Sequence, residues 1–385
     1  MKSIYYWSPF TSKVATVNAV INSAYSLNKY SKEFETFIIN SFGEWDEYAE
    51  ELKIKGINLV NINNSSFLKR INRTGYFRSR FSYILIFLYN FYPLLKLFIN
   101  KKPDYLLIHL ITSLPILLKI IFPIKTKIIL RISGLPKLNP IRKMFWRLGS
   151  KYLYMITCPT NETLTYLKDL KIFNENKIYL LRDPIVSISD ISKKKSQKID
   201  ETFIKEKKYI LAVGRLTKQK NFIFLIECFK EIIKNFNYLQ LIIIGEGEEK
   251  KVLEDKIIKN NLQDKVFLIG YKKNVYKYYD KCLFFVLSSL WEDPGFVIIE
   301  SFSCNTLVLS SDCNNGPKEI INNEKNGFLF KVNNKSDFIT KFYHILDSKN
   351  AFDINNKILG GKLESRKYTN YFHFKSLNQL LKNYK

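Results

Sequence analysis

Short apolar runs of strand length alternate with helical stretches along most of the chain, in two successive series. Strands of a parallel sheet are buried on both faces, so they read as unbroken apolar runs separated by helices. The pattern therefore predicts an α/β protein with two doubly wound, Rossmann-like domains that face each other across a cleft. Strands are expected at Lys2–Trp7, Glu35–Asn40, Ile57–Ile62, Tyr105–Leu110 and Lys127–Ile132 in the first series, and at Tyr209–Val213, Leu239–Ile244, Val266–Ile269, Leu283–Leu287 and Thr306–Ser310 in the second.

The length of 385 residues is too great for one ordinary hydrophobic core and suits two domains. A polar, Lys-rich stretch, residues 186–208, separates the two series and is expected to be a linker. The N-terminal domain then covers residues 1–185, and the C-terminal domain covers residues 209–350. The last segment, residues 351–385, has a helical pattern with several aromatic residues, and we expect it to pack back on the N-terminal domain.

The N-terminal half is strongly basic. The chain has 61 Lys and Arg residues against 35 Asp and Glu residues, a net charge of +26. Between Leu52 and Asn161, 19 basic residues stand against one acid, Asp104, so this stretch carries a net charge of +18. Such an asymmetry predicts an anionic partner, either phospholipid, a phosphorylated substrate or nucleic acid. Nucleic acid is disfavoured, because the basic residues alternate with buried apolar strands and no RNP, helix-turn-helix or zinc pattern occurs.

One apolar stretch, Phe81–Ile99, holds 19 residues with a single charge, Lys96, and is long enough to span a bilayer. Asn90, Pro93 and three tyrosines argue against a lipid-facing span. Three alternatives stay open, namely a helix in the headgroup layer, a core helix of the first domain and a true span. The basic and aromatic segment over about residues 66–102 is expected to face a membrane. Five basic residues precede the apolar stretch: Lys69, Arg70, Arg73, Arg78 and Arg80.

The cysteine pattern predicts a reducing, cytosolic environment. The five cysteines are odd in number, are scattered and never form a C-x-x-C pair, so we expect reduced core thiols. Met1–Phe10 lacks the charged and apolar regions of a signal peptide and is expected to be the first strand.

The segment Trp291–Glu300, W-E-D-P-G-F-V-I-I-E, places two carboxylates around a Pro-Gly turn at the end of a strand. Glu292 falls in the loop, and Glu300 lies just inside a helix that starts near Gly295. A helix N-terminus offers free N–H groups and a positive dipole to a phosphate. The two carboxylates could accept hydrogen bonds from the hydroxyls of a sugar or a ribose. The alternative is that Glu292 is a solvated loop acid and Glu300 a surface residue.

Three more loops follow strands of the second series. Residues 214–221, G-R-L-T-K-Q-K-N, join the first strand to its helix. Ligands of open α/β sheets bind outside the carboxyl ends of the strands, where Arg215 and Lys220 would offer two cations to a diphosphate. Gly245 ends the next strand in a G-E-G turn, and Tyr271 follows a third as a platform for a base.

Together these residues resemble the retaining family 4 glycosyltransferases of the GT-B fold. The E-x7-E element, the G-R-L…K-N loop, the I-I-G-E-G turn and the N-N-G-P-K-E-I segment at residues 314–320 occur in the order and spacing of that family. The resemblance covers about Tyr209–Asn333 and is weaker in the first domain. It implies that the C-terminal domain binds a nucleotide sugar and that the N-terminal domain binds the acceptor.

The resemblance implies a role for each matching residue of the second domain. Arg215 and Lys220 would bind the donor's diphosphate and support its departure. Glu292 would contact the hydroxyls of the donor sugar, and Glu300 would hold the ribose. The remaining donor contacts are expected from Gly245, Tyr271, Gly295, Phe296 and Val297, the last three through backbone N–H groups.

In the first domain, His109 matches the family's histidine near the anomeric carbon, although a histidine satisfied inside the core is the alternative. The family commonly has a Gly-Gly pair after its first strand, and this chain has none there. Ser12 and Lys13 would replace it through a side-chain hydrogen bond and a charge. Arg131 either binds an acceptor phosphate or pairs with a carboxylate.

The resemblance implies transfer of a hexose or N-acetylhexosamine from a nucleoside-diphosphate sugar, with UDP as the family's default. The basic, aromatic first domain predicts an acceptor at a membrane surface, such as a polyprenyl-diphosphate-linked saccharide. We therefore expect a peripheral enzyme on the cytoplasmic face that builds bacterial surface polysaccharide, O-antigen (lipopolysaccharide) or capsule.

No metal and no other cofactor is expected, because the chain has neither a D-x-D motif nor a His/Cys cluster and the cations would replace a metal. A nucleotide-sugar epimerase or another GT-B enzyme, such as a phosphorylase, is the nearer alternative, and a basic nucleic-acid-binding protein is the distant one. An NAD-dependent dehydrogenase is disfavoured, because G-x-G-x-x-G is missing.

Overall fold

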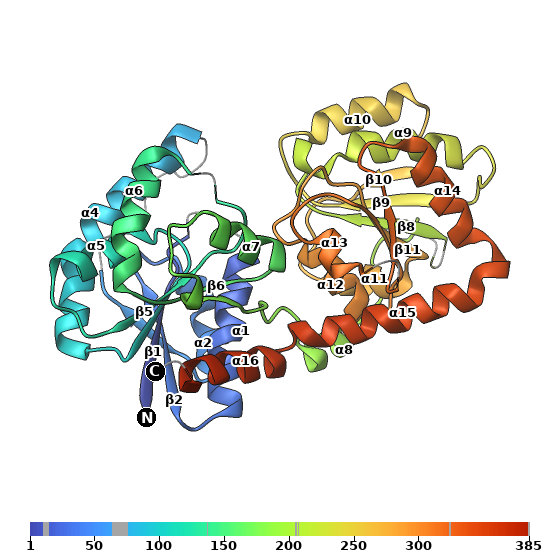
Figure 1. The fold of residues 1–385 in the computed structure, drawn as a ribbon. Coiled ribbons are helices and arrows are strands. Elements are labelled where there is room, and N and C mark those ends of the chain that lie inside the picture. Colours follow the sequence, from blue (N-terminus) through green and yellow to red (C-terminus); the bar gives the residue numbers. More distant parts are fainter. Residues whose placement is uncertain are drawn as a thin grey trace. The chain divides into compact units, whose positions relative to one another are not determined.

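The computed structural model divides the chain into two compact units. The first unit comprises Met1–Pro184 together with Asn370–Lys385, and the second comprises Ile185–Thr369 (Figure 1). The residues that the structure describes are 1–10, 15–63, 76–136, 138–204, 206, 208–322 and 325–383.

A seven-stranded parallel sheet forms the centre of the first unit, in the order β3-β2-β1-β4-β5-β6-β7. The order changes direction between β1 and β4. In open α/β sheets this switch point is where loops part and leave room for a ligand. The strands are β1 (Lys2–Trp7), β2 (Phe34–Asn40), β3 (Asn58–Asn61), β4 (Tyr105–Ile108), β5 (Lys127–Arg131), β6 (Leu153–Cys158) and β7 (Ile178–Leu180).

Helices cover both faces of this sheet, because successive strand residues point to opposite sides. Tyr5 and Trp7 belong to one core with α4–α7, while Ile4 and Tyr6 belong to the other with α1, α2 and α16. The helices are α1 (Ala15–Tyr30), α2 (Ala49–Ile54), α4 (Tyr76–Lys101), α5 (Ser113–Ile121), α6 (Pro140–Gly149), α7 (Asn161–Asp169) and α16 (Asn370–Asn383).

The second unit repeats the plan with a six-stranded parallel sheet in the order β10-β9-β8-β11-β12-β13. Its switch point lies between β8 and β11. The strands are β8 (Tyr209–Val213), β9 (Gln240–Ile244), β10 (Val266–Leu268), β11 (Phe284–Leu287), β12 (Val308–Ser311) and β13 (Phe328–Phe330).

Two helical layers enclose this second sheet. Leu241 and Ile243 of β9 pack on the side of α9, α10 and α14, and Ile242 and Ile244 pack on the side of α8, α11 and α12. The helices are α8 (Ile188–Lys195), α9 (Phe222–Ile232), α10 (Lys250–Lys259), α11 (Tyr276–Lys281), α12 (Phe296–Ser303), α13 (Pro317–Ile320), α14 (Lys335–Leu346) and α15 (Ala351–Ser365).

The ten strands predicted from the sequence are all present, and the α/β class with two parallel sheets is confirmed. Sequence reasoning missed β6, β7 and β13. Two of these have only three residues, too few for a period to be recognised. The five cysteines are buried and free, as predicted. The cleft between the two domains stays a prediction.

Two predicted borders are wrong. The stretch 186–208 is not a free linker, because Ile191 of α8 and Ile204 are buried in the second unit's core. Two well-placed isoleucines thus anchor an otherwise polar, Lys-rich segment. Of the segment 351–385, α16 belongs to the first unit, whereas α15 belongs to the second and packs against α12.

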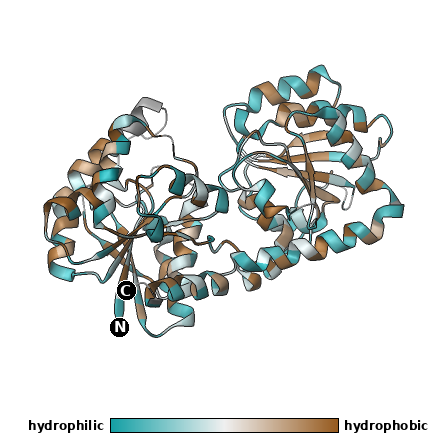
Figure 2. Ribbon diagram, viewed as in Figure 1, coloured by the Kyte–Doolittle hydropathy of each residue, from teal (hydrophilic) through white to brown (hydrophobic). Residues whose placement is uncertain are grey.

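Helix α4 combines a buried face with an exposed one. Leu94, Leu97 and Phe98 pack into the first unit's core, while Leu88 and Tyr92 are exposed. Hydrophobic residues colour parts of α4 as well as the strands in Figure 2. By length and composition alone it is the one candidate membrane span among the described residues, with a third of its apolar window buried. The core-helix alternative therefore holds for one face, and contact of the other face with lipid stays a prediction.

Substituting Gly361 of α15 should destabilise the second unit. A Cβ at this buried glycine would lie 2.5 Å from the Phe302 ring of α12, so the helices approach closely only because the side chain is missing. We expect Gly361→Val to lower the unfolding free energy by about 1–3 kcal/mol, as overpacking does. A thermal melt monitored by circular dichroism measures this loss. Leu363→Val, at an exposed position of the same helix, controls for the lower helix propensity of valine. Equal melting of the two variants would contradict the close packing.

Candidate functional site

Loops from five strands meet at the carboxyl edge of the second sheet, because all its strands are parallel. Backbone hydrogen bonds join the loops after β8 and β9, from Leu216 N to Glu246 O (2.9 Å). Others join the loops after β11 and β12, from Glu292 N to Asn314 O (3.1 Å). The N–H of Leu290 donates to Gln219 O at 2.8 Å and so links the β8 and β11 loops across the switch point. The rim is therefore one connected structure.

Two glycines permit this close approach of backbones. Gly245 has a φ of +152°, and a Cβ there would lie 1.9 Å from the carbonyl oxygen of Gly214. Gly316 has a φ of +131°, and its Cβ would lie 1.8 Å from Pro294 O. No side chain fits at either position, so the glycines of both motifs serve loop-to-loop packing.

A buried ion pair between Lys220 and Glu292 lies at the centre of this rim. Lys220 Nζ is 2.5 Å from Glu292 Oε1, and the two side chains are 11% and 6% exposed. Ser289 donates its hydroxyl to the same carboxylate oxygen. Gly214 makes room for the lysine, since a Cβ there would lie 2.9 Å from Lys220 Cε. The sequence predicted both residues at this edge but did not predict that they pair.

Glu300 lies on α12 beside aromatic residues. The Tyr279 hydroxyl donates to Glu300 Oε2 at a long 3.5 Å. Burial, opposed by this hydrogen bond and by the charge of Lys220, raises the pKa of Glu300 to about 7. The carboxyl is therefore partly protonated near neutral pH, and it changes charge easily when a polar ligand arrives.

The turn before α12 has the form that the sequence indicated. Gly295 stands at the helix N-cap with a φ of +88°, and α12 begins at Phe296. Among the described residues, the N–H groups of Phe296 and Val297 have no hydrogen-bond acceptor. Free N–H groups at a helix start can receive an anion.

Arg215 and Tyr271 lie on the same rim but are not fixed by it. Both side chains are exposed, Tyr271 to 70%. Among the residues that the structure describes, Arg215 makes no ion pair. These two side chains are free to change conformation around a ligand.

His109 follows β4 at the switch point of the first sheet, where its N–H donates to Trp7 O at 3.0 Å. Its Nε2 is buried and has no hydrogen-bond partner among the described residues. Burial, aided by the charges of Arg131 and His373, lowers the pKa of His109 to about 3. The ring is therefore neutral at physiological pH and could act as a hydrogen-bonding group.

His373 is not among the predicted site residues, and α16 places it buried in the first unit. One ring nitrogen lies 2.8 Å from Ser23 Oγ of α1, and the other lies 2.7 Å from Arg182 O. Arg131 takes the second of its two predicted alternatives, because it pairs with Asp183 at 2.6 Å and donates to Leu181 O. No local motif could reveal His373, since its partners are far away in the sequence.

Several predicted residues cannot be placed. Ser12 and Lys13 lie outside the described residues, and so do Lys69, Arg70 and Arg73. Arg78 and Arg80 fall in α4, but their side chains are not described.

The sequence is similar to those of known glycosyltransferases. Residues 193–358 match the family model described as glycosyl transferases group 1. An uncharacterized glycosyltransferase of Methanocaldococcus jannaschii is 34% identical over 257 residues, which are 61% of this chain and 62% of that protein. A Campylobacter jejuni N-acetylgalactosamine-N,N'-diacetylbacillosaminyl-diphospho-undecaprenol 4-alpha-N-acetylgalactosaminyltransferase is 30% identical over 220 residues, 55% of this chain and 58% of that protein. The chain thus matches less than two thirds of the length of either relative.

The fold also matches solved structures. A glycosyltransferase from Rickettsia africae superposes with a TM-score of 0.78 at 16% sequence identity, over 100% of this chain and 98% of the other. At this identity the likeness shows the fold, which is GT-B.

Replacing Glu300 should give a pH-dependent change in stability. Its pKa is about 7 in the folded unit against 4.5 ordinarily, so the folded state holds the proton more tightly. The stability that this tighter proton binding contributes is complete below the ordinary pKa of 4.5, and it is lost as the pH rises through the folded-state pKa of about 7. Because Glu300→Gln imitates the protonated carboxyl, its melting temperature relative to wild type should rise between about pH 5 and about pH 8. Glu254→Gln, on the exposed face of α10, should show no such trend. A constant difference for Glu300→Gln would argue against the raised pKa.

Proposed function

We propose that this chain transfers a sugar with retention of anomeric configuration, because residues 193–358 match the model of the glycosyl transferases group 1 family. The donor is a nucleoside-diphosphate hexose or N-acetylhexosamine, with UDP as the first nucleotide to test. The observation that carries the proposal is the buried Lys220–Glu292 pair beneath interlocked loops.

Donor binding would exchange the partners of that pair. The diphosphate attracts Lys220, and the hydroxyls of the sugar donate to the Glu292 carboxylate that Lys220 gives up. Each buried charge then keeps a partner, which matters because an uncompensated buried charge costs roughly 3–5 kcal/mol. A ligand with only one of the two groups would leave one charge unsatisfied, so the pair favours a molecule that joins a diphosphate to a polyol.

The other residues of the rim complete the proposed donor site. Arg215 reaches the diphosphate from the exposed side, and the N–H groups of Phe296 and Val297 receive sugar or phosphate oxygens. Glu300 accepts hydrogen bonds from the ribose hydroxyls, and Tyr271 covers the base.

Catalysis would depend on where charge develops. As the glycosidic bond breaks, positive charge grows on the sugar and negative charge on the departing phosphate. Cations and helix N–H groups that meet this negative charge stabilise the transition state more than the ground state. Arg215 and Lys220 do this work in place of a metal, so a chelator should leave turnover unchanged. His109, neutral and partly buried, would hydrogen-bond to the sugar near its anomeric carbon.

The acceptor is proposed to be a polyprenyl-diphosphate-linked saccharide, in the assembly of a bacterial surface polysaccharide. The name of the Campylobacter relative describes such a diphospho-undecaprenol acceptor for that protein. The stretch of charge +18 and the exposed side chains of α4 support a site on an anionic membrane surface, at its cytoplasmic face.

Arg215→Ala should reduce turnover by about 10²–10³-fold, the typical cost of losing one group that stabilises the transition-state charge. The Arg215 side chain is exposed, so the variant should melt like wild type. Release of nucleoside diphosphate from a panel of nucleotide sugars measures the effect and identifies the donor. Lys218→Ala, an exposed neighbour in the same loop, is the matched control. Unchanged turnover in Arg215→Ala would refute the diphosphate assignment.

The full chain should sediment with anionic vesicles at low salt and less at high salt, because exposed charge attraction is screened. Leu88→Asn, at a position of α4 that is 61% exposed, should weaken sedimentation at both salt concentrations by removing apolar contact. Glu254→Gln serves again as the distant control. Failure to sediment at either salt concentration would defeat the membrane assignment.

A further inference from the structure

A preformed cavity lies at the amino edge of the first sheet, away from the switch-point histidine. It has a volume of about 640 Å³, within the range of small-molecule sites. Tyr105, which lines it, begins β4, whereas His109 follows the other end of that strand. The cavity therefore does not belong to the sugar-transfer site proposed above.

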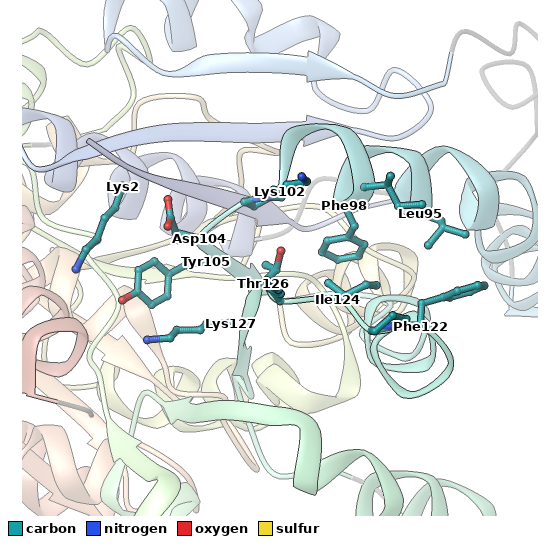
Figure 3. A pocket seen from close by; sticks show the side chains of 14 residues that line it. Lys2, Leu95, Phe98, Lys102, Asp104, Tyr105, Phe122, Ile124, Thr126 and Lys127 are labelled. Atoms are coloured by element: carbon teal, nitrogen blue, oxygen red, sulfur yellow. The ribbon is translucent and has the colours of Figure 1, made fainter.

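The two ends of this cavity differ in chemistry. Lys2, Tyr105 and Lys127 gather at one end in Figure 3, and apolar side chains gather at the other. Lys102 and Lys125 also line it. The apolar end is formed by Leu95, Phe98, Phe122 and Ile124.

The lysines of the lining are not neutralised by ion pairs within the described part of the protein. Among the described residues, Lys2, Lys102, Lys125 and Lys127 form no ion pair, and all four are exposed. The single acid of the lining, Asp104, accepts hydrogen bonds from the N–H (2.8 Å) and the hydroxyl (3.1 Å) of Ser3. The lining thus holds four lysines and one engaged carboxylate, an excess of positive charge that an anion would balance.

Hydrogen bonds fix the wall between α5 and β5. Lys119 of α5 donates to the carbonyl oxygens of Ile124 and Thr126 from a half-buried position. The N–H of Lys127 donates to Asp104 O at 3.0 Å and ties this wall to the start of β4. A cavity with a fixed wall loses little entropy when it binds a ligand.

The apolar end opens toward exposed apolar side chains. Ile99 of α4 lines the cavity and is nevertheless 58% exposed, and Ile121 at the end of α5 is 54% exposed. A hydrocarbon chain that leaves the cavity would therefore continue along apolar surface.

We propose that this cavity binds one anionic phospholipid molecule, with its phosphate at the lysines and part of one acyl chain against Phe98 and Ile124. The charge excess at one end and the apolar lining at the other select a molecule with both features. Such binding would attach the first unit to a bilayer through a single lipid, in addition to contact by the surface of α4.

Isothermal calorimetry with the full chain and no nucleotide sugar tests this, so the result does not depend on the proposed function. Dioctanoyl phosphatidylglycerol, below its micelle concentration, should bind with a stoichiometry of one. Dioctanoyl phosphatidylcholine keeps the tails but loses the net charge, and glycerol 1-phosphate keeps the charge but loses the tails. Each of these two control ligands should bind about tenfold more weakly or worse, and a tenfold weaker Kd is a loss of about 1.4 kcal/mol of binding free energy. Equal binding of phosphatidylcholine, or of glycerol 1-phosphate, would overturn the proposal.

Matched variants locate the binding. Lys127→Glu should weaken phosphatidylglycerol binding at least about tenfold, while Lys101→Glu, exposed but outside the lining, should not. Ile99→Asn should weaken it as well, whereas Leu88→Asn, exposed on the same helix but outside the cavity, should leave it unchanged. Both lining variants alter exposed side chains, and thermal melts verify that they fold. Equal losses in lining and control variants would place the lipid on the general surface and refute the cavity site.

Discussion

The buried ion pair between Lys220 and Glu292 is the interaction on which the second unit's site depends. It joins the loop after β8 to the loop after β11, the two strands on either side of the switch point. Removing water from two charges is costly, and the cost is offset only when geometry is good and further hydrogen bonds are made. Ser289 supplies one of these at Glu292, and Gly214 leaves space for the lysine's stem. The rim is thus held together by the same groups that would receive a donor.

Much of this site could be predicted from the sequence, because its residues lie in short segments at the ends of recognisable strands. Parallel strands bring their carboxyl ends to one edge, so Lys220, Glu292 and Glu300 had to be near neighbours once the strands were known. The direct pairing of Lys220 with Glu292 could not be predicted, since it depends on side-chain paths set by Gly214. The sequence also could not show why position 245 must be glycine, because the Gly214 carbonyl that excludes a side chain there belongs to another loop.

The first unit was harder to predict, for a reason of topology. Its core takes Leu377 and Leu381 from α16, and His373 reaches Ser23 and the Arg182 carbonyl from the far end of the chain. Hydrophobic periodicity predicts that a segment is a helix, but it does not predict which element the helix packs against. The polar stretch after Pro184 was wrongly predicted to be a linker for a related reason. Two buried isoleucines are enough to anchor this segment, although its composition alone indicates exposure to solvent.

The division of the chain has a consequence for how it folds during synthesis. The second unit, Ile185–Thr369, is continuous, and its two ends are held together by a bridge between Val186 and Thr369. The first unit is discontinuous and needs α16 for its core. A ribosome therefore releases everything that the second unit requires before it releases the helix that completes the first. The unit made first is completed last, and until then the surface of α1 that α16 covers stays open to chaperones and to premature association.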